Sequence, residues 1–122
     1  MPNKLVVSFE GDHIKVISDG DKDYDFVLQM WTEVAAMARE QQCFDVLGLA
    51  STTTPLEAVD GYDQARLFRE LDMPNNIRIA WVESNSDAVD IASFVELVLT
   101  NRGYSAKVFA TEAEARTWLL GD

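Results

Sequence analysis

The residues of this chain that could take part in chemistry begin with a run of four hydroxyl side chains, Ser51-Thr52-Thr53-Thr54. The run precedes Pro55 and Glu57, where a helix is expected to begin. A hydroxyl at a helix start is a suitable phosphate acceptor, because the helix N-terminus stabilises added negative charge. The alternative is structural: Thr54 caps the helix, Pro55 takes the first helical position and Glu57 closes a capping box. We favour the capping interpretation.

His13 and Cys43 each occur once in the chain, which limits the catalytic arrangements that it could build. Because there is only one histidine, the chain has no spare histidine for a Ser-His-Asp arrangement or for a metal site built from histidines. We expect His13 to be a solvated side chain on an edge strand. Cys43 has no neighbouring cation to activate it, so we expect a buried structural thiol. The sequence therefore predicts no enzymatic activity, no metal and no cofactor.

Trp81 is the aromatic residue with the most suggestive position. It stands near the end of a predicted strand, Ile77–Val82, and Ser84 follows in the loop Glu83–Asp87. Crevices in α/β proteins open at the carboxyl ends of parallel strands, where Trp81 would line a pocket for an apolar ligand or form part of a partner surface. The residues that we predict to bind a ligand or partner are Ser51, Thr52, Thr54, Trp81 and Ser84.

The composition is that of an acidic globular protein. The chain has 122 residues, with 10 basic and 21 acidic side chains and a net charge of −11. This balance disfavours nucleic acid and anionic membrane surfaces, whose phosphates attract basic residues. The surplus acid either keeps the protein dispersed or matches a basic protein partner. The length and the 48% apolar content predict one folded domain over residues 1–122.

No stretch indicates targeting to or insertion into a membrane. No apolar run approaches the roughly 18–20 residues that span a bilayer, so we expect no transmembrane segment. The first residues lack the charged and apolar regions of a signal peptide, and a single cysteine excludes an internal disulfide. We therefore expect a cytoplasmic protein.

The stretch from Ile77 to Asn101 indicates the architecture most clearly. The strand Ile77–Val82 leads into a helix that has Ala88, Ile91, Ala92, Val95, Val98 and Leu99 on one face, with Ser84 or Ser86 as its cap. Before it we predict strands Lys4–Phe9 and His13–Ser18 as a hairpin, a polar loop Asp19–Asp23 that ends in a helix cap, a helix Tyr24–Gln41 and a strand Phe44–Ala50. A helical stretch then runs to about Asp72, in which Gly61 could interrupt the helix and Asp60 with Asp63 could cap a second start. After it we predict a strand Ser105–Ala110 and a short helix capped by Thr111 and Glu114. Right-handed crossovers would make the last four strands parallel.

This element order, with Phe109-Ala110-Thr111-Glu112-Ala113-Glu114-Ala115-Arg116-Thr117-Trp118-Leu119 at its end, resembles the SpoIIAA-like family of STAS-type domains. These domains are bacterial relatives of the anti-sigma factor antagonists. The family often closes on an aromatic strand end, an acidic capped turn and an Ala-x-x-Trp-Leu helix, which is present here as Ala115, Trp118 and Leu119. The resemblance implies an α/β fold with a five-stranded mixed sheet, an N-terminal hairpin followed by parallel strands in sequential order, and helices mainly on one face.

The resemblance also guides the functional interpretation. The antagonists carry a phosphorylatable serine in an Asp-Ser-Ser-Gly-like stretch, but the corresponding Ala50–Pro55 segment has neither the Asp nor the Gly, so the phosphoswitch is not carried over. The leading hypothesis is a non-enzymatic regulatory or protein-interaction module, whose partner is another protein or a second copy of the chain in a homodimer. The alternative is a carrier of a small apolar ligand or lipid, with a pocket near Trp81 and the Ser51–Thr54 loop.

Overall fold

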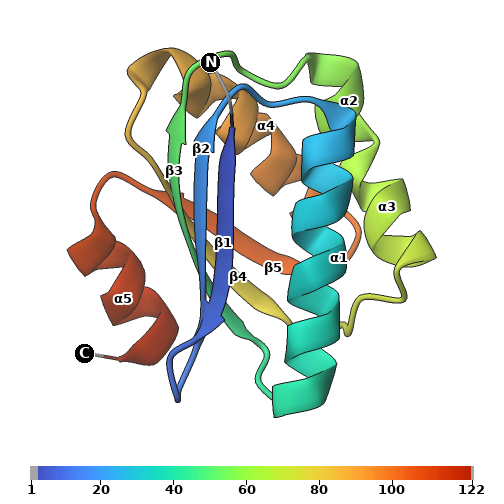
Figure 1. Ribbon diagram of the computed structural model, residues 1–122, viewed down its shortest axis with the longest axis vertical. Coiled ribbons are helices and arrows are strands. Elements are labelled where there is room, and N and C mark those ends of the chain that lie inside the picture. Colours follow the sequence, from blue (N-terminus) through green and yellow to red (C-terminus); the bar gives the residue numbers. More distant parts are fainter. Residues whose placement is uncertain (1–2, 122) are drawn as a thin grey trace.

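The computed structural model describes residues 3–121, which form a five-stranded sheet covered by helices (Figure 1). The elements are β1 (Lys4–Phe9), β2 (Ile14–Gly20), α1 (Tyr24–Gln41), β3 (Asp45–Thr52), α2 (Ala58–Tyr62), α3 (Gln64–Glu70), β4 (Arg78–Glu83), the 3-10 turn η1 (Ser86–Ala88), α4 (Val89–Thr100), β5 (Ser105–Phe109) and α5 (Glu112–Leu120). None of the helices within this range has the length and apolar character needed to cross a bilayer.

The sheet has the sequential order β1-β2-β3-β4-β5, as predicted. β1 and β2 form the antiparallel hairpin, in which Val7 lies opposite Val16, and each later pair of neighbouring strands is parallel. The alternation in β2 buries Ile14 and Val16 completely. Because β2 lies between β1 and β3, it is an inner strand, and only β1 and β5 are edges.

The helices lie mainly on one face of the sheet, which confirms the expected asymmetry. In Figure 1, α1 and α3 stand on one side of the strands and α5 on the other. The main core packs side chains of α1, α3 and α4, among them Trp31, Phe68 and Leu99, against the strands. A smaller core on the other face holds Ala115 and Leu119 of α5 against Leu47 and Ala80.

Two helix starts form as the sequence predicts. The Asp23 carboxylate accepts a hydrogen bond from the Phe26 backbone N–H at 2.8 Å, and α1 runs over the predicted range. At α5 the Thr111 hydroxyl accepts from the Glu114 N–H at 3.2 Å, while the two side chains contact each other at 3.0 Å. These caps depend on neighbours in the chain alone, so local reasoning is sufficient for them.

The capping box predicted at Thr54 is wrong. The helix begins at Ala58, with Glu57 at the cap position and no side-chain cap bond. Instead, the Thr54 carbonyl accepts from the Lys22 N–H at 2.9 Å, and the Thr53 N–H donates to the Gly20 carbonyl at 2.8 Å. These bonds extend the pairing of β2 with β3 past Thr52, and they keep the segment from turning into a helix.

The cap expected from Ser84 or Ser86 is also wrong. Asn85 is the capping residue, since its side-chain oxygen accepts from the Asp87 N–H at 3.0 Å and opens η1 rather than α4. The helical stretch expected to end near Asp72 is divided into α2 and α3, as the expected interruption near Gly61 implied, but the break is at Asp63 and its side chain forms no cap bond.

α5 is fastened to β4 by Arg78. Its guanidinium donates to the carbonyls of Trp118 at 2.8 Å and Leu119 at 3.1 Å, at the C-terminal end of the helix. The same guanidinium lies 4.6 Å from the centre of the Trp118 ring, which also packs against Phe109 at 5.6 Å. Trp118 is half-buried rather than fully enclosed, and it packs beside the buried Ala115 and Leu119 of a helix that stands alone on its face.

Gly48 on β3 and Trp81 on β4 lie opposite each other in the sheet and approach each other closely. A Cβ atom on Gly48 would stand only 2.0 Å from Trp81 Cε3 and 2.2 Å from Cζ3. The indole therefore lies against the backbone of β3, and only glycine leaves room for it there.

We expect Gly48→Ala to lower the free energy of unfolding by about 3 kcal/mol, the upper part of the range for overpacked cores. The physical reason is the overlap with the indole. In a Trp81→Leu background the same change should cost little, because the overlapping atoms are then absent. Urea denaturation of the four proteins of this cycle measures the coupling, and equal costs in both backgrounds would contradict the close approach.

We also expect Trp118→Ala to lower the free energy of unfolding by about 3 kcal/mol, because the contacts with Phe109 and Arg78 hold α5 to the sheet. Tyr62→Ala serves as the control, since Tyr62 is an aromatic residue on a helix but is 55% exposed. Chemical denaturation compares the two variants. Similar midpoints would show that Trp118 does not anchor α5.

Candidate functional site

A small cavity of about 90 Å³ lies between the sheet and the helices of the main core. Its walls are almost entirely apolar. They are formed by Val27, Met30 and Trp31 of α1, Ile91, Ala92, Val95 and Leu99 of α4, and Ile79, Trp81, Ala106 and Val108 of the strands. The volume exceeds what one water molecule needs, about 10–15 Å³, and is well below the roughly 300 Å³ of pockets for large ligands. The cavity therefore suits a small group.

The aromatic side of this cavity is held in a defined position. Trp31 and Trp81 lie with ring centres 6.1 Å apart. Trp31 is buried, packs edge-on against Phe68 at 4.9 Å, and donates its indole N–H to the Gln64 side-chain oxygen at 2.9 Å. The Trp81 ring packs directly against the backbone of β3 at Gly48. The two indoles thus form a wall with little freedom to rearrange.

A polar cluster at the carboxyl ends of β3 and β4 borders the cavity. The Glu83 carboxylate accepts from the backbone N–H groups of Thr52 and Asn85, each at 3.1 Å, and from the Thr52 hydroxyl. The Asn85 side-chain amide donates to the Thr52 carbonyl at 2.6 Å. Charge-assisted bonds of this kind fix the strand ends relative to each other.

Lys22 lies at the same end of the sheet and lines the cavity. Its ammonium donates to the carbonyls of Ser18 at 3.0 Å and Gly20 at 3.3 Å. Partial burial lowers the pKa of Lys22 below its ordinary value, and the nearby carboxylates of Glu83, Asp19 and Asp21 oppose this shift. Because the folded-state pKa is depressed, the unfolded chain binds more protons just below pH 10.5, and stability rises with pH through that window.

The structure brings together some of the predicted site residues but not all of them. Thr52 and Trp81 both line the cavity. Ser84 is exposed beside them, with its hydroxyl donating to the Ala50 carbonyl at 3.1 Å. Ser51 and Thr54 are exposed and outside the cavity wall, since the loop that carries them pairs with the end of β2.

Sequence reasoning missed five polar residues of the cavity wall: Ser18, Lys22, Gln64, Glu96 and Lys107. Ser18 carried a usable signal, because it continues the inward alternation of Ile14 and Val16 on β2. Lys22 stands in a polar loop and Gln64 at a helix start, where no periodicity distinguishes an inward side chain.

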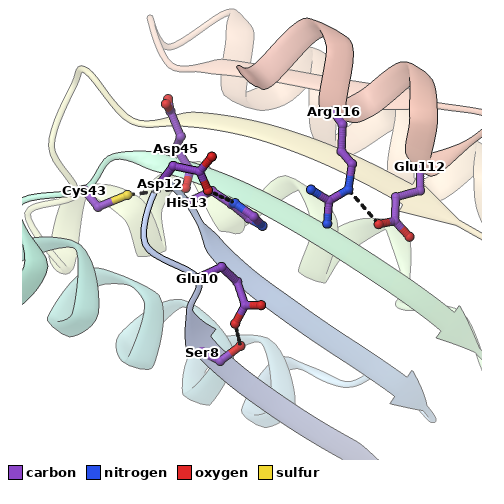
Figure 2. Close-up of polar contacts among 8 residues, drawn as sticks. All are labelled: Ser8, Glu10, Asp12, His13, Cys43, Asp45, Glu112 and Arg116. Atoms are coloured by element: carbon purple, nitrogen blue, oxygen red, sulfur yellow. Dashed lines mark hydrogen bonds and ion pairs between the residues drawn. The ribbon is translucent and has the colours of Figure 1, made fainter. Parts of the chain in front are cut away.

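The expectation of a solvated His13 is wrong. Its side chain is buried, and its ring Nδ1–H donates to the Asp12 carboxylate at 2.7 Å (Figure 2). This bond holds the pKa of the Asp12 carboxyl below its usual range. The prediction failed because it placed His13 on an edge strand, whereas β2 is flanked on both sides. The pair lies at the start of β2, at the opposite end of the strand from the cavity's Ser18.

We expected Cys43 to be a buried thiol, but it is only partly buried. The thiol is half-buried beside the main core, and its Sγ lies 3.9 Å from the Asp45 carbonyl (Figure 2). Within residues 3–121, no three His, Cys, Asp or Glu side chains lie close enough together to hold a metal ion.

A second hollow, of about 240 Å³, lies on the surface between α2 and α4. It is lined by Tyr62, Phe94, Leu97, Val98, Asn101 and Arg102. Tyr62 and Leu97 are each 55% exposed, and Val59, one helical turn before Tyr62, is 62% exposed. We call Val59, Tyr62, Leu97 and this hollow the α2–α4 surface. Tyr62 and Leu97 line the same hollow, unlike the single exposed apolar residues that most surfaces carry.

Comparison with protein families finds no match for the chain, and no curated protein matches it significantly. Among solved structures, the chain is similar to an uncharacterised protein of the DUF3478 family from Shewanella loihica PV-4, which has a SpoIIAA-like fold. The two are 12% identical, the match covers 96% of this chain and 93% of that one, and the TM-score is 0.53. At this identity the likeness shows the fold alone. The chain has a SpoIIAA-like fold, as the resemblance implied.

We expect Glu83→Gln to lower the free energy of unfolding by about 1.5–3 kcal/mol, because three donors lose a charged acceptor and Lys22 loses a nearby carboxylate. Glu33→Gln, at an exposed position on α1, is the matched control and should be neutral within about 0.5 kcal/mol. Urea denaturation at neutral pH compares them. If the two variants are equally stable, Glu83 does not fasten the strand ends.

Proposed function

We propose that this protein is a non-enzymatic regulatory module that acts by binding a protein partner through the α2–α4 surface. The observation that carries this proposal is the exposure of Tyr62 and Leu97 around a hollow of about 240 Å³. A hollow rimmed by exposed apolar side chains suits an anchoring side chain of another protein.

The position of the two helices supports a preformed surface. A Cβ atom on Gly61 would lie 3.1 Å from Ile91 Cδ1 and 3.3 Å from Val95 Cγ2, so α2 approaches α4 closely at that residue. This contact defines the spacing of Tyr62 and Leu97. A surface that is already formed loses little conformational entropy on binding.

The negative net charge of the protein indicates which kind of protein partner it attracts. The net charge is −11, and long-range attraction therefore favours a protein with basic residues around an apolar anchor. The SpoIIAA-like fold supports a regulatory role by analogy, because binding and regulatory roles are the usual inference for that branch of STAS-type domains.

A second candidate function is the carriage of a small apolar ligand in the cavity beneath α4. Its support is the cavity itself, with the two indoles on one side and a polar border formed by Thr52, Glu83 and Lys22. The two functions are compatible, since α4 contributes Val95 to the cavity and Leu97 to the outer surface.

We expect Leu97→Glu to weaken binding of the partner by about 30-fold, which corresponds to the loss of one energetic anchor of about 2 kcal/mol. Val6→Glu is the matched control, since Val6 is a partly exposed apolar residue on β1. Affinity capture followed by titration of each purified retained protein measures the effect, and native mass spectrometry does so if the partner is a second copy.

Retention of the same proteins with equal affinity by both variants would contradict the assignment of the interface. Denaturation midpoints of the two variants show whether each remains folded, so that a loss of binding can be attributed to the surface.

A further inference from the structure

One polar group in the main core has no partner. The Ser18 side chain is completely buried, and its Oγ forms no hydrogen bond. Within the part of the chain that the structure describes, the only other buried side-chain nitrogen or oxygen without a partner is His13 Nε2, which is not in the cavity wall. Ser18 lies on the same side of β2 as Ile14 and Val16 and lines the cavity beneath α4.

An unpartnered buried hydroxyl is unfavourable, because it has given up its bonds to water without replacing them. A valine or alanine at this position of β2 would continue the apolar alternation without that cost. The Ser18 hydroxyl therefore calls for a partner that enters the cavity, either a small molecule or an ordered water.

Three of the charged residues around the cavity, Lys22, Glu83 and Glu96, already have hydrogen-bond partners. Lys22 donates to two carbonyls, and Glu83 accepts from Thr52 and Asn85. The Glu96 carboxylate accepts from the Val108 N–H of the edge strand β5 at 2.6 Å. The fourth charged residue, Lys107, is exposed, and its ammonium lies 5.5 Å from the centre of the Phe109 ring, so its charge stays in contact with water. A charged ligand inside the cavity would find no uncommitted counterion among Lys22, Glu83 and Glu96 and would lose its hydration, so the cavity favours a neutral molecule.

The size and shape of the cavity limit the class of ligand that it can hold. Its volume of about 90 Å³ admits a group no larger than about one ring, and the nearby indoles of Trp31 and Trp81 suit a flat apolar body. Because Ser18 has no exposed area, a ligand reaches its Oγ only if the covering side chains move apart. Ile91 and Val95 of α4 are only half-buried and can do so.

We propose that the cavity binds a neutral, single-ring molecule bearing one hydrogen-bonding group, and that this group pairs with the Ser18 hydroxyl. The proposal rests on the second candidate function and names its ligand class. Ser18 supplies both a donor and an acceptor, so it accommodates a hydroxyl or a carbonyl on the ligand.

The experiment titrates the protein with phenol, toluene and benzoate, which share a ring but differ in the polar group. Indole N–H signals in proton–nitrogen correlation spectra report the binding. Trp31 and Trp81 are in the cavity wall, whereas Trp118 lies with the smaller core on the other face and serves as an internal control.

We expect saturable shifts of Trp31 and Trp81, an unmoved Trp118, and phenol binding about three- to tenfold tighter than toluene, with benzoate weakest. In Ser18→Ala the preference for phenol over toluene should disappear. It should persist in Ser51→Ala, because Ser51 is exposed and outside the cavity wall.

The outcomes distinguish a failure of the ligand-binding function itself from a failure of the proposed ligand class or of the role of Ser18. If phenol and toluene bind equally, or if the preference survives in Ser18→Ala, the ligand function stands and the role of Ser18 is wrong. Tighter binding of benzoate overturns the preference for a neutral ligand. If none of the probes gives a saturable shift, the cavity holds water at most, and both the ligand function and its ligand class are overturned.

Discussion

The contact between the Trp81 indole and the Gly48 backbone is the constraint on which the candidate site depends. Because β3 has no side chain at that point, the indole lies against the sheet instead of projecting into the helices. This position places it beside Trp31 and leaves a space that no other side chain fills. A larger residue at Gly48 would overlap the ring in this position, so the indole side of the cavity depends on one close packing contact.

The carboxyl ends of the strands are fastened by polar bonds that surround the cavity without entering it. Glu83 joins β4 to β3, and Lys22 folds back over the end of β2. Satisfied polar groups of this kind are rigid, whereas α4 covers the cavity with half-buried side chains. The same helix presents Leu97 outward beside α2. The two proposed sites therefore lie on opposite faces of one helix.

At the opposite end of the sheet, the polar side chains of His13 and Arg78 make structural contacts. His13 and Asp12 form a close pair, but His13 Nε2 is enclosed and has no partner within the described residues. Arg78 likewise serves a structural purpose, since it binds the last carbonyls of α5 where a helix end attracts a cation. Both residues lie at the N-terminal ends of parallel strands, His13 just before β2 and Arg78 at the start of β4.

The sequence by itself determined the hairpin and the two helix starts at Asp23 and Thr111, because periodicity and caps depend on near neighbours in the chain. The sequential order of the parallel strands followed from the resemblance to the SpoIIAA-like family. The sequence also indicated Thr52 and Trp81 at the strand ends. Only the tertiary structure decided that Thr54 is not a cap, since backbone bonds to the distant Lys22 segment hold it extended. The alternation of β2 indicates that Ser18 points inward. The cavity beside Ser18, however, depends on how α1 and α4 meet the sheet, and such contacts between distant segments leave no local pattern.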